Sequence, residues 1–223
     1  MESITHISEN YKKISSELPP QVQLVAVSKT YPAEAVKILY DAGHRTFGEN
    51  RVQELLEKSE QLPKDIKWHL IGNLQSNKVK QIVPFIDVIE SVDSEKILRE
   101  IDRQAARFGR KIKVLLQVKI AREDSKFGLT HEEARGIFNN YLQPLDRNIE
   151  IDGLMGMATF TEDEEQITDE FNSLKALFDE LSAQKKLNTL SMGMSGDYKL
   201  AINCGATSVR IGSGIFGQRQ YDR

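Results

Sequence analysis

The sequence predicts an α/β fold, namely a parallel (β/α)8 TIM barrel with an additional N-terminal helix. Short apolar runs rich in β-branched residues alternate with segments of helical periodicity along the chain. That order is typical of a parallel sheet with helical crossovers. About eight such repeats favour a closed barrel over an open doubly wound sheet. No Gly-x-Gly-x-x-Gly motif follows the first apolar run, which further weakens the open alternative.

The first expected element is an amphipathic helix within residues 1–17. Its apolar residues recur near helical spacing and are Ile4, Ile7, Tyr11 and Ile14. Such spacing predicts a helix with one apolar face. Pro19-Pro20 should end it, because proline lacks the N–H group that a continuing helix would need.

Strand and helix segments then alternate to the end of the chain. Each strand is expected where an apolar run lacks helical spacing, and each helix where apolar residues return every three or four positions. The strand ranges are 22–27, 46–47, 68–71, 88–90, 114–120, 151–157, 189–192 and 208–211. The helix ranges are 32–42, 50–60, 76–82, 94–108, 130–141, 163–184 and 197–203.

Several helix starts carry recognisable signals. Pro32 fits the first turn of the helix over 32–42, where a missing N–H costs nothing. Thr130-x-x-Glu133 and Thr161-x-x-Glu164 both have the capping-box pattern, in which a hydroxyl and a carboxylate satisfy backbone N–H groups. Asn50 is expected as the N-cap of the helix over 50–60.

Composition is that of an ordinary globular protein, with 39% hydrophobic and 28% charged residues. We expect one domain over residues 1–223. The net charge of −3 argues against nucleic-acid or membrane partners, which usually require a basic excess. Cys204 is the sole cysteine, so no internal disulfide is possible. With no leader-like or membrane-spanning segment in the sequence, a cytoplasmic location is expected.

Lys29 directly follows the first apolar run, which extends from Val22 to Ser28 and holds the first expected strand. Barrel active sites lie at the carboxyl ends of the strands, and a lysine held at the rim of the core can become a nucleophile. A lysine there can also be a surface residue whose stem covers apolar core while its ammonium reaches water. Lone lysines at strand ends are common, so position alone favours this second interpretation.

Two short Gly/Ser turns change the balance, Met194-Ser195-Gly196 after the seventh strand and Gly212-Ser213-Gly214 after the eighth. Barrels often bind phosphate in these two loops. Each turn offers backbone N–H groups and one hydroxyl, and Ser195 is expected to cap the helix starting near residue 197. Barrel closure would place strand eight beside strand one, so Lys29 and both turns would share one mouth. A Schiff-base amine beside a phosphate cradle is what pyridoxal 5'-phosphate (PLP) requires.

Arg210 lies two residues before Gly212. Its guanidinium could face the pyridine nitrogen of the cofactor, and a permanent cation there would keep that nitrogen unprotonated. The alternative is a structural ion pair with a neighbouring acid. If the first interpretation holds, the cofactor is poorly suited to carbanion chemistry.

Several segments resemble the pyridoxal phosphate homeostasis protein family, also described as alanine-racemase N-terminal-domain-like or proline-synthase co-transcribed. The resemblance runs in order along essentially the whole chain. Its segments are Ala26-Val27-Ser28-Lys29-Thr30, Phe47 to Glu54, Trp68 to Lys78, Ser125-Lys126-Phe127-Gly128, Gly153-Leu154-Met155, Leu190 to Ser195, and Val209 to Gly217.

The resemblance implies a role for each site residue. Lys29 would carry the cofactor as an internal aldimine, and Arg210 would face the pyridine nitrogen. The remaining cofactor-binding residues would be Asn50 and Met194 along the ring, and Ser195, Gly212 and Ser213 at the phosphate. Ser213 replaces a threonine found in many relatives but keeps the hydroxyl.

Three functions fit these features. A carrier or regulator would hold the aldehyde on Lys29 and exchange it, acting in vitamin B6 homeostasis and meeting PLP-dependent apoenzymes transiently. A racemase-like enzyme would need a second acid/base on the other face of the ring. Since the chain ends at Arg223, we expect neither the β-domain that supplies this base nor the dimer built on it, hence a monomer and no enzyme. An aldolase-like lysine is the weakest alternative.

Several other polar features have ordinary structural explanations. His69 is expected to be a hydrogen-bonded core residue, and Cys204 a small buried apolar one. No metal site is expected, because His-Glu-x-x-His and paired-cysteine patterns are absent from the sequence. The Gln75-Ser76-Asn77-Lys78 turn could be a second anion contact, but a cap and an exposed lysine are the simpler interpretation.

Overall fold

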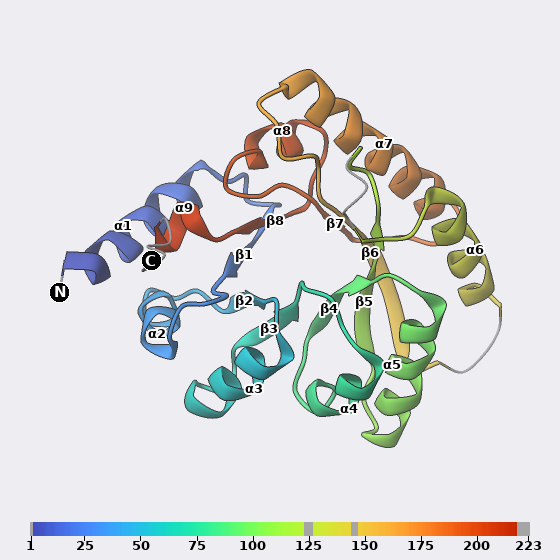
Figure 1. Ribbon diagram of the computed structural model, residues 1–223, viewed down its shortest axis with the longest axis horizontal. Coiled ribbons are helices and arrows are strands. Elements are labelled where there is room, and N and C mark those ends of the chain that lie inside the picture. Colours follow the sequence, from blue (N-terminus) through green and yellow to red (C-terminus); the bar gives the residue numbers. More distant parts are fainter. Residues whose placement is uncertain (1, 123–126, 144–146, 218–223) are drawn as a thin grey trace.

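The computed structural model describes residues 2–122, 127–143 and 147–217, and it is a closed barrel of parallel strands inside a ring of helices (Figure 1). The strands follow chain order around the barrel, and β1 closes it by pairing with β8. Their bounds are β1 Gln23–Val27, β2 Thr46–Glu49, β3 Lys67–Leu70, β4 Val88–Val92, β5 Ile112–Val118, β6 Ile149–Gly156, β7 Thr189–Ser191 and β8 Ser208–Ile211. The predicted fold class is therefore confirmed.

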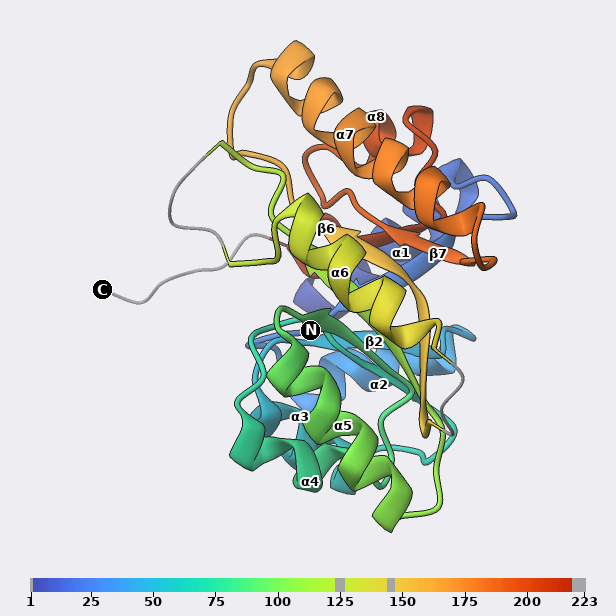
Figure 2. The same ribbon diagram turned by 90° about the vertical axis from the view of Figure 1, so that its right-hand side faces the viewer.

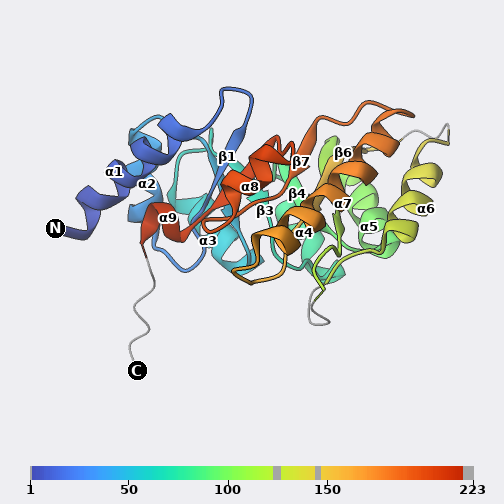
Figure 3. The same ribbon diagram turned by 90° about the horizontal axis from the view of Figure 1, so that it is seen from above.

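Helices cover the outside of the sheet, as Figures 2 and 3 show from two further directions. Their bounds are α1 Glu2–Glu17, α2 Ala33–Asp41, α3 Val52–Gln61, η1 Ser76–Lys78, α4 Val79–Ile82, α5 Glu95–Arg107, α6 His131–Tyr141, α7 Glu164–Ser182, α8 Tyr198–Asn203 and α9 Ser213–Phe216. Each long helix buries an apolar stripe on the barrel, as α7 does with Phe171, Leu174 and Leu181. Burial of that stripe is the main source of helix stability.

The additional N-terminal helix packs beside α9 and α2, so the two ends of the described chain lie close together (Figures 1 and 3). Asn10 Nδ2 donates to the carbonyl oxygen of Ile215 at 3.2 Å. The ring of Tyr11 meets that of His44 edge-on at 5.2 Å between centroids. These contacts hold α1 against α9, which follows β8, and against His44, which precedes β2.

The helix caps confirm one expectation from the sequence and correct two. Thr130 and Glu133 form the predicted capping box, but α7 is capped by the Asp163 carboxylate, so the box at Thr161 is wrong. Aspartate at this position accepts from two backbone N–H groups and leaves Thr161 only a local turn bond. The N-cap of α3 is Arg51, so Asn50 is not a cap.

Polar side chains are buried in two places in this fold, inside the barrel and between the sheet and the surrounding helices. Glu90 of β4 and Ser191 of β7 belong to strands that are not neighbours, yet Ser191 Oγ donates to Glu90 Oε2 at 2.6 Å. Their side chains therefore meet inside the barrel. Glu49 of β2 instead contacts Lys58 of α3 at 2.6 Å, between the sheet and the helix layer.

Candidate functional site

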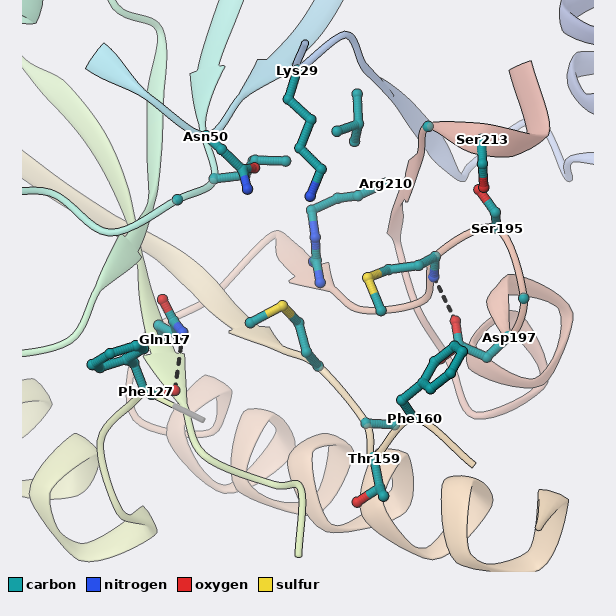
Figure 4. Close-up of a pocket in the computed structure, with 18 of the residues that line it drawn as sticks. Lys29, Asn50, Gln117, Phe127, Thr159, Phe160, Ser195, Asp197, Arg210 and Ser213 are labelled. Carbon is teal, nitrogen blue, oxygen red and sulfur yellow. Dashed lines mark hydrogen bonds between the residues drawn. The ribbon is translucent and has the colours of Figure 1, made fainter. Parts of the chain in front are cut away.

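Lys29 lies in a tight turn that leaves the carboxyl end of β1. The backbone N–H of Tyr31 donates to the carbonyl oxygen of Ser28 at 3.1 Å, which places Lys29 and Thr30 at the centre of the turn. Thr30 has a φ of 69°, the value a type II turn requires at its third residue. The Lys29 side chain is half-buried and extends into a cavity (Figure 4).

That cavity, of about 730 Å³, opens at the carboxyl end of the barrel. All seven residues predicted as cofactor contacts line it: Lys29, Asn50, Met194, Ser195, Arg210, Gly212 and Ser213. Barrel closure therefore brings together residues from the two ends of the chain, as expected. Their assignment as cofactor ligands stays a prediction.

Other lining residues were not anticipated from the sequence. Gln117 comes from the end of β5, and the others come from the loops after β1, β5, β6 and β7, namely Tyr31, Phe127, Thr159, Phe160 and Asp197. Gln117 Nε2 donates to the carbonyl oxygen of Phe127 at 3.0 Å and holds that loop against the end of β5 (Figure 4). The only sequence signal for this wall was the family-like segment at 125–128, of which Ser125 and Lys126 lie outside the described residues.

The first Gly/Ser turn leaves β7 through Gly193, which has a φ of 94°. A Cβ there would lie 2.6 Å from Cβ of Ala201, so only glycine lets α8 pack this closely. The turn is closed by Asp197, whose Oδ1 accepts from the backbone N–H of Met194 at 2.6 Å. Asp197, and not Ser195, is the N-cap residue of α8.

Ser195 has a different role from the predicted cap. Its Oγ accepts from the backbone N–H of Gly214 at 3.1 Å and so joins the two Gly/Ser turns directly. Gly212 is the N-cap residue of α9, and a Cβ on it would lie 3.2 Å from the carbonyl oxygen of Val27. The second turn is therefore packed on the end of β1, beside Lys29. Figure 4 shows the hydroxyls of Ser195 and Ser213 facing each other.

Arg210 forms the floor of the cavity. Its side chain is 3% exposed, and it donates from Nη1 to Ser191 Oγ at 2.6 Å and from Nη2 to the carbonyl oxygen of Gly156 at 2.8 Å. Burial lowers the pKa of the guanidinium, and the charges of Glu90 and Asp197 oppose that shift. The ion pair with a neighbouring acid, which was the alternative interpretation of Arg210, is present, since Nη1 lies 3.8 Å from Glu90 Oε2.

Glu90 continues this polar chain to the far wall of the barrel. Its Oε1 lies 2.6 Å from His69 Nδ1, so His69 is the hydrogen-bonded core residue that was expected. Burial raises the pKa of the Glu90 carboxyl, but His69, Arg210 and Ser191 outweigh it, and the net shift is downward. Arg210 is thus held in place by a charged and fully bonded carboxylate.

The turn at residues 75–78 and Cys204 both lie away from the cavity lining. Ser76–Lys78 forms the short helix η1, and none of residues 75–78 lines the cavity. Cys204 is only partly buried, at the end of α8, and burial raises its pKa. Among the described residues, no three His, Cys, Asp or Glu side chains are grouped to hold a metal ion. None of the helices described there has the length and apolar character needed to cross a membrane.

Comparison with known proteins identifies the family. The family model for the alanine racemase N-terminal domain matches residues 3–220. The pyridoxal phosphate homeostasis protein of Aquifex aeolicus is 39% identical over 202 residues, covering 89% of this chain and 88% of the relative. The human protein of the same name is 42% identical over 219 residues, covering 91% and 78%.

Solved structures agree. PipY of Synechococcus elongatus, solved with PLP bound, is 39% identical, with a TM-score of 0.86 over 95% of this chain and 100% of PipY. Alanine racemase of Clostridium difficile shares 15% identity and a TM-score of 0.78, covering 98% of this chain and 58% of the racemase, which is a likeness of fold alone. The chain therefore belongs to the pyridoxal phosphate homeostasis protein family, built on the alanine racemase N-terminal domain.

Proposed function

We propose that this protein binds PLP in the barrel cavity, holds it covalently on Lys29, and serves PLP homeostasis as a single domain over residues 1–223. The observation that carries the proposal is the joining of three features in one cavity. Lys29 follows β1, and the two Gly/Ser turns that follow β7 and β8 are bonded to each other through Ser195 and Gly214. The PLP-bound relative PipY supports the same ligand.

The donor set fits a phosphate ester. Within residues 2–122, 127–143 and 147–217, no protein group accepts from the backbone N–H of Ser195, Gly196 or Ser213. The hydroxyls of Ser195 and Ser213 lie beside these N–H groups, so uncharged donors surround one space (Figure 4). Such a nest of N–H and O–H donors suits a phosphate dianion.

PLP supplies an aldehyde whose carbon can form an imine with an amine. Lys29 would supply the nitrogen of this imine, and the aldehyde oxygen would leave as water with the two hydrogens of the neutral amine. A second amine could then take the place of the Lys29 nitrogen on that carbon, which would free the lysine. Arg210, a fixed cation at the cavity floor, and Asn50 on the cavity wall would hold the ring of the cofactor.

The engagement of the other ionisable groups favours holding over catalysis. The Tyr31 hydroxyl donates to the carbonyl oxygen of Gly217 at 2.8 Å, and Asp197 accepts from Met194. Arg210 is bonded to Ser191 and Gly156. Two-base racemisation needs a mobile acid/base on each ring face. We therefore propose a carrier that exchanges its cofactor with apoenzymes; a racemase-like enzyme of low activity is the second candidate.

The test begins with purified protein, PLP and borohydride. We expect a visible imine absorption band that borohydride converts into a permanent adduct, located at Lys29 by peptide mass mapping. Lys29→Ala should lose the adduct, while Lys119→Ala, another lysine following a strand, should keep it. An adduct on another lysine, or none in the unmodified chain, would disprove the proposal. Sustained racemisation of an amino acid that Lys29→Ala abolishes would favour the enzyme.

A further inference from the structure

Two side chains of helix α3 form hydrogen bonds with the backbone on either side of Lys29. Lys58 Nζ donates to the carbonyl oxygen of Ser28 at 2.7 Å, and that carbonyl belongs to the peptide group preceding Lys29. Glu54 Oε2 accepts from the backbone N–H of Thr30 at 2.7 Å, and that N–H belongs to the peptide group following Lys29. Glu54 and Lys58 are one helical turn apart and lie 3.8 Å from each other.

The Lys58 anchor is itself fixed by buried groups. Glu49 Oε1 accepts from Lys58 Nζ and from Ser28 Oγ, both at 2.6 Å, so one carboxylate oxygen ties β1, β2 and α3 together. Ser28 and Glu49 are fully buried, and Lys58 is 6% exposed. Burial raises the pKa of Glu49, and the charge and hydrogen bond of Lys58 oppose the rise. Charge-assisted bonds shielded from water in this way are strong and directional.

The turn needs such an anchor because its backbone is strained. Thr30 has the only positive φ among the non-glycine residues described, and threonine is β-branched. L-residues with a branched Cβ avoid this region, so surrounding bonds must hold the conformation. The bond from Thr30 N–H to Glu54 acts on the strained residue itself.

We propose that Glu54 and Lys58 are positioning residues for Lys29, which fix the direction in which its amine enters the cavity and so set how readily it forms the imine. Neither residue lines the cavity. They act through the two peptide groups that flank Lys29. The inference rests on the proposed function, because it assigns a partner helix to the proposed attachment lysine.

Glu54 is the better residue to change. Its side chain is 23% exposed, and its removal leaves Lys58 paired with Glu49. Removing Lys58 would leave the Glu49 carboxylate buried without its cation. The variants are Glu54→Ala, Glu54→Leu, which keeps the volume, and Glu54→Gln, which keeps an oxygen acceptor. Glu57→Ala on the same helix is the matched control, because Glu57 is exposed and bonds only to Gln53 on α3 among the described residues.

The measurement separates covalent attachment from binding. Each variant is titrated with PLP and with pyridoxine 5'-phosphate, which carries an alcohol instead of the aldehyde and forms no imine. The rate of imine formation is followed by visible absorption, and urea unfolding reports folding. We expect Glu54→Ala and Glu54→Leu to form the imine about tenfold more slowly, with pyridoxine 5'-phosphate affinity changed less than about twofold. Glu54→Gln and Glu57→Ala should stay near the unmodified protein.

The outcomes distinguish this inference from the proposed function. Equal losses for the two ligands, or an unchanged imine rate in the folded Ala and Leu variants, would overturn the positioning role while leaving Lys29 as the attachment site. A Glu54→Gln variant as slow as Glu54→Ala would also overturn it in its present form, because an oxygen acceptor would not be enough. If the unmodified protein forms no adduct at Lys29, the proposed function itself fails.

Discussion

Val25 of β1 lies directly beside Arg210 of β8 in the sheet register. This pairing joins segments that are far apart in the sequence. It also sets how far along the barrel axis the residues that follow β1 and β8 lie. Lys29 follows Val25 by four residues and Gly212 follows Arg210 by two, so both reach the same mouth. The lysine, the buried arginine and the second Gly/Ser turn are therefore brought together by barrel closure, and a shift of one register position would separate them.

The Arg210 end of this arrangement depends on Glu90. Glu90→Gln keeps the shape of the side chain but removes the carboxylate that forms the buried ion pair with the Arg210 guanidinium. We expect the free energy of unfolding to fall by about 3 kcal/mol at neutral pH. The same change at exposed Glu95, which pairs with Arg99 one turn away, should cost less than about 0.5 kcal/mol. Urea denaturation of the three proteins provides the comparison.

The pH dependence gives a second check on Glu90. Its pKa lies below the ordinary value of 4.5, so the stability it contributes is complete above that pH. That contribution is lost as the pH falls through the lowered pKa. The difference between the unmodified protein and Glu90→Gln should therefore be constant near neutrality and shrink only in acid. A difference that shrank already on the way from neutrality to pH 4.5 would contradict the charged state assigned to Glu90.

His44 should dominate the loss of stability in mild acid. It is buried beneath Tyr11 and Phe47, and its Nε2 lies 2.7 Å from the carbonyl oxygen of Thr46. Burial lowers its pKa from 6.5 to about 4, although the bond to Thr46 acts in the opposite direction. The folded state therefore resists protonation, and stability is lost as the pH falls from 6.5 towards 4.

The measurement is the free energy of unfolding as a function of pH. We expect the unmodified protein to lose about 2 kcal/mol between about pH 7 and about pH 5 from this group alone. His44→Gln, which keeps a donor for Thr46, should flatten the slope even though it is less stable at pH 7. His6→Gln, at an exposed histidine, should leave the slope unchanged. An unaltered slope in His44→Gln would show that another group titrates.

Much of the fold was predictable because it repeats one local rule. Alternating apolar runs and amphipathic segments predicted the strands to within a few residues, and barrel closure then placed Lys29 beside the two turns. The caps at Asn50, Thr161 and Ser195 were wrong, because several nearby oxygens compete for the same N–H groups and only the folded geometry selects one.

The unanticipated parts of the site have a common origin. Tyr31, Phe127 and Asp197 reach the cavity from different loops, whose paths are set by tertiary contacts and not by periodicity. Glu54 and Lys58 sit on a helix where their spacing reads as an ordinary surface ion pair. Their hydrogen bonds to the backbone beside Lys29 depend on the way α3 packs on β1 and β2.

Gly72 packs directly against the backbone of Asn50, a residue that lines the cavity. It follows β3, and a Cβ added to it would lie 2.2 Å from the carbonyl oxygen of Asn50 and 2.7 Å from its Cα. These are backbone atoms of a cavity-lining residue, so the clash cannot be relieved by a side-chain rotation. Gly72→Ala must therefore displace Asn50 or the loop that carries it.

A glycine in open space provides the control for this substitution. Gly136 lies inside α6 with no atom within 4 Å of an added Cβ, so Gly136→Ala should stabilise the protein by about 1 kcal/mol through helix propensity. Gly72→Ala should destabilise it by about 2 kcal/mol. It should also weaken binding of pyridoxine 5'-phosphate, since that ligand reports the cavity wall without the imine. Urea denaturation and a ligand titration of both variants measure the two effects, and unchanged affinity in Gly72→Ala would remove Asn50 from the binding wall.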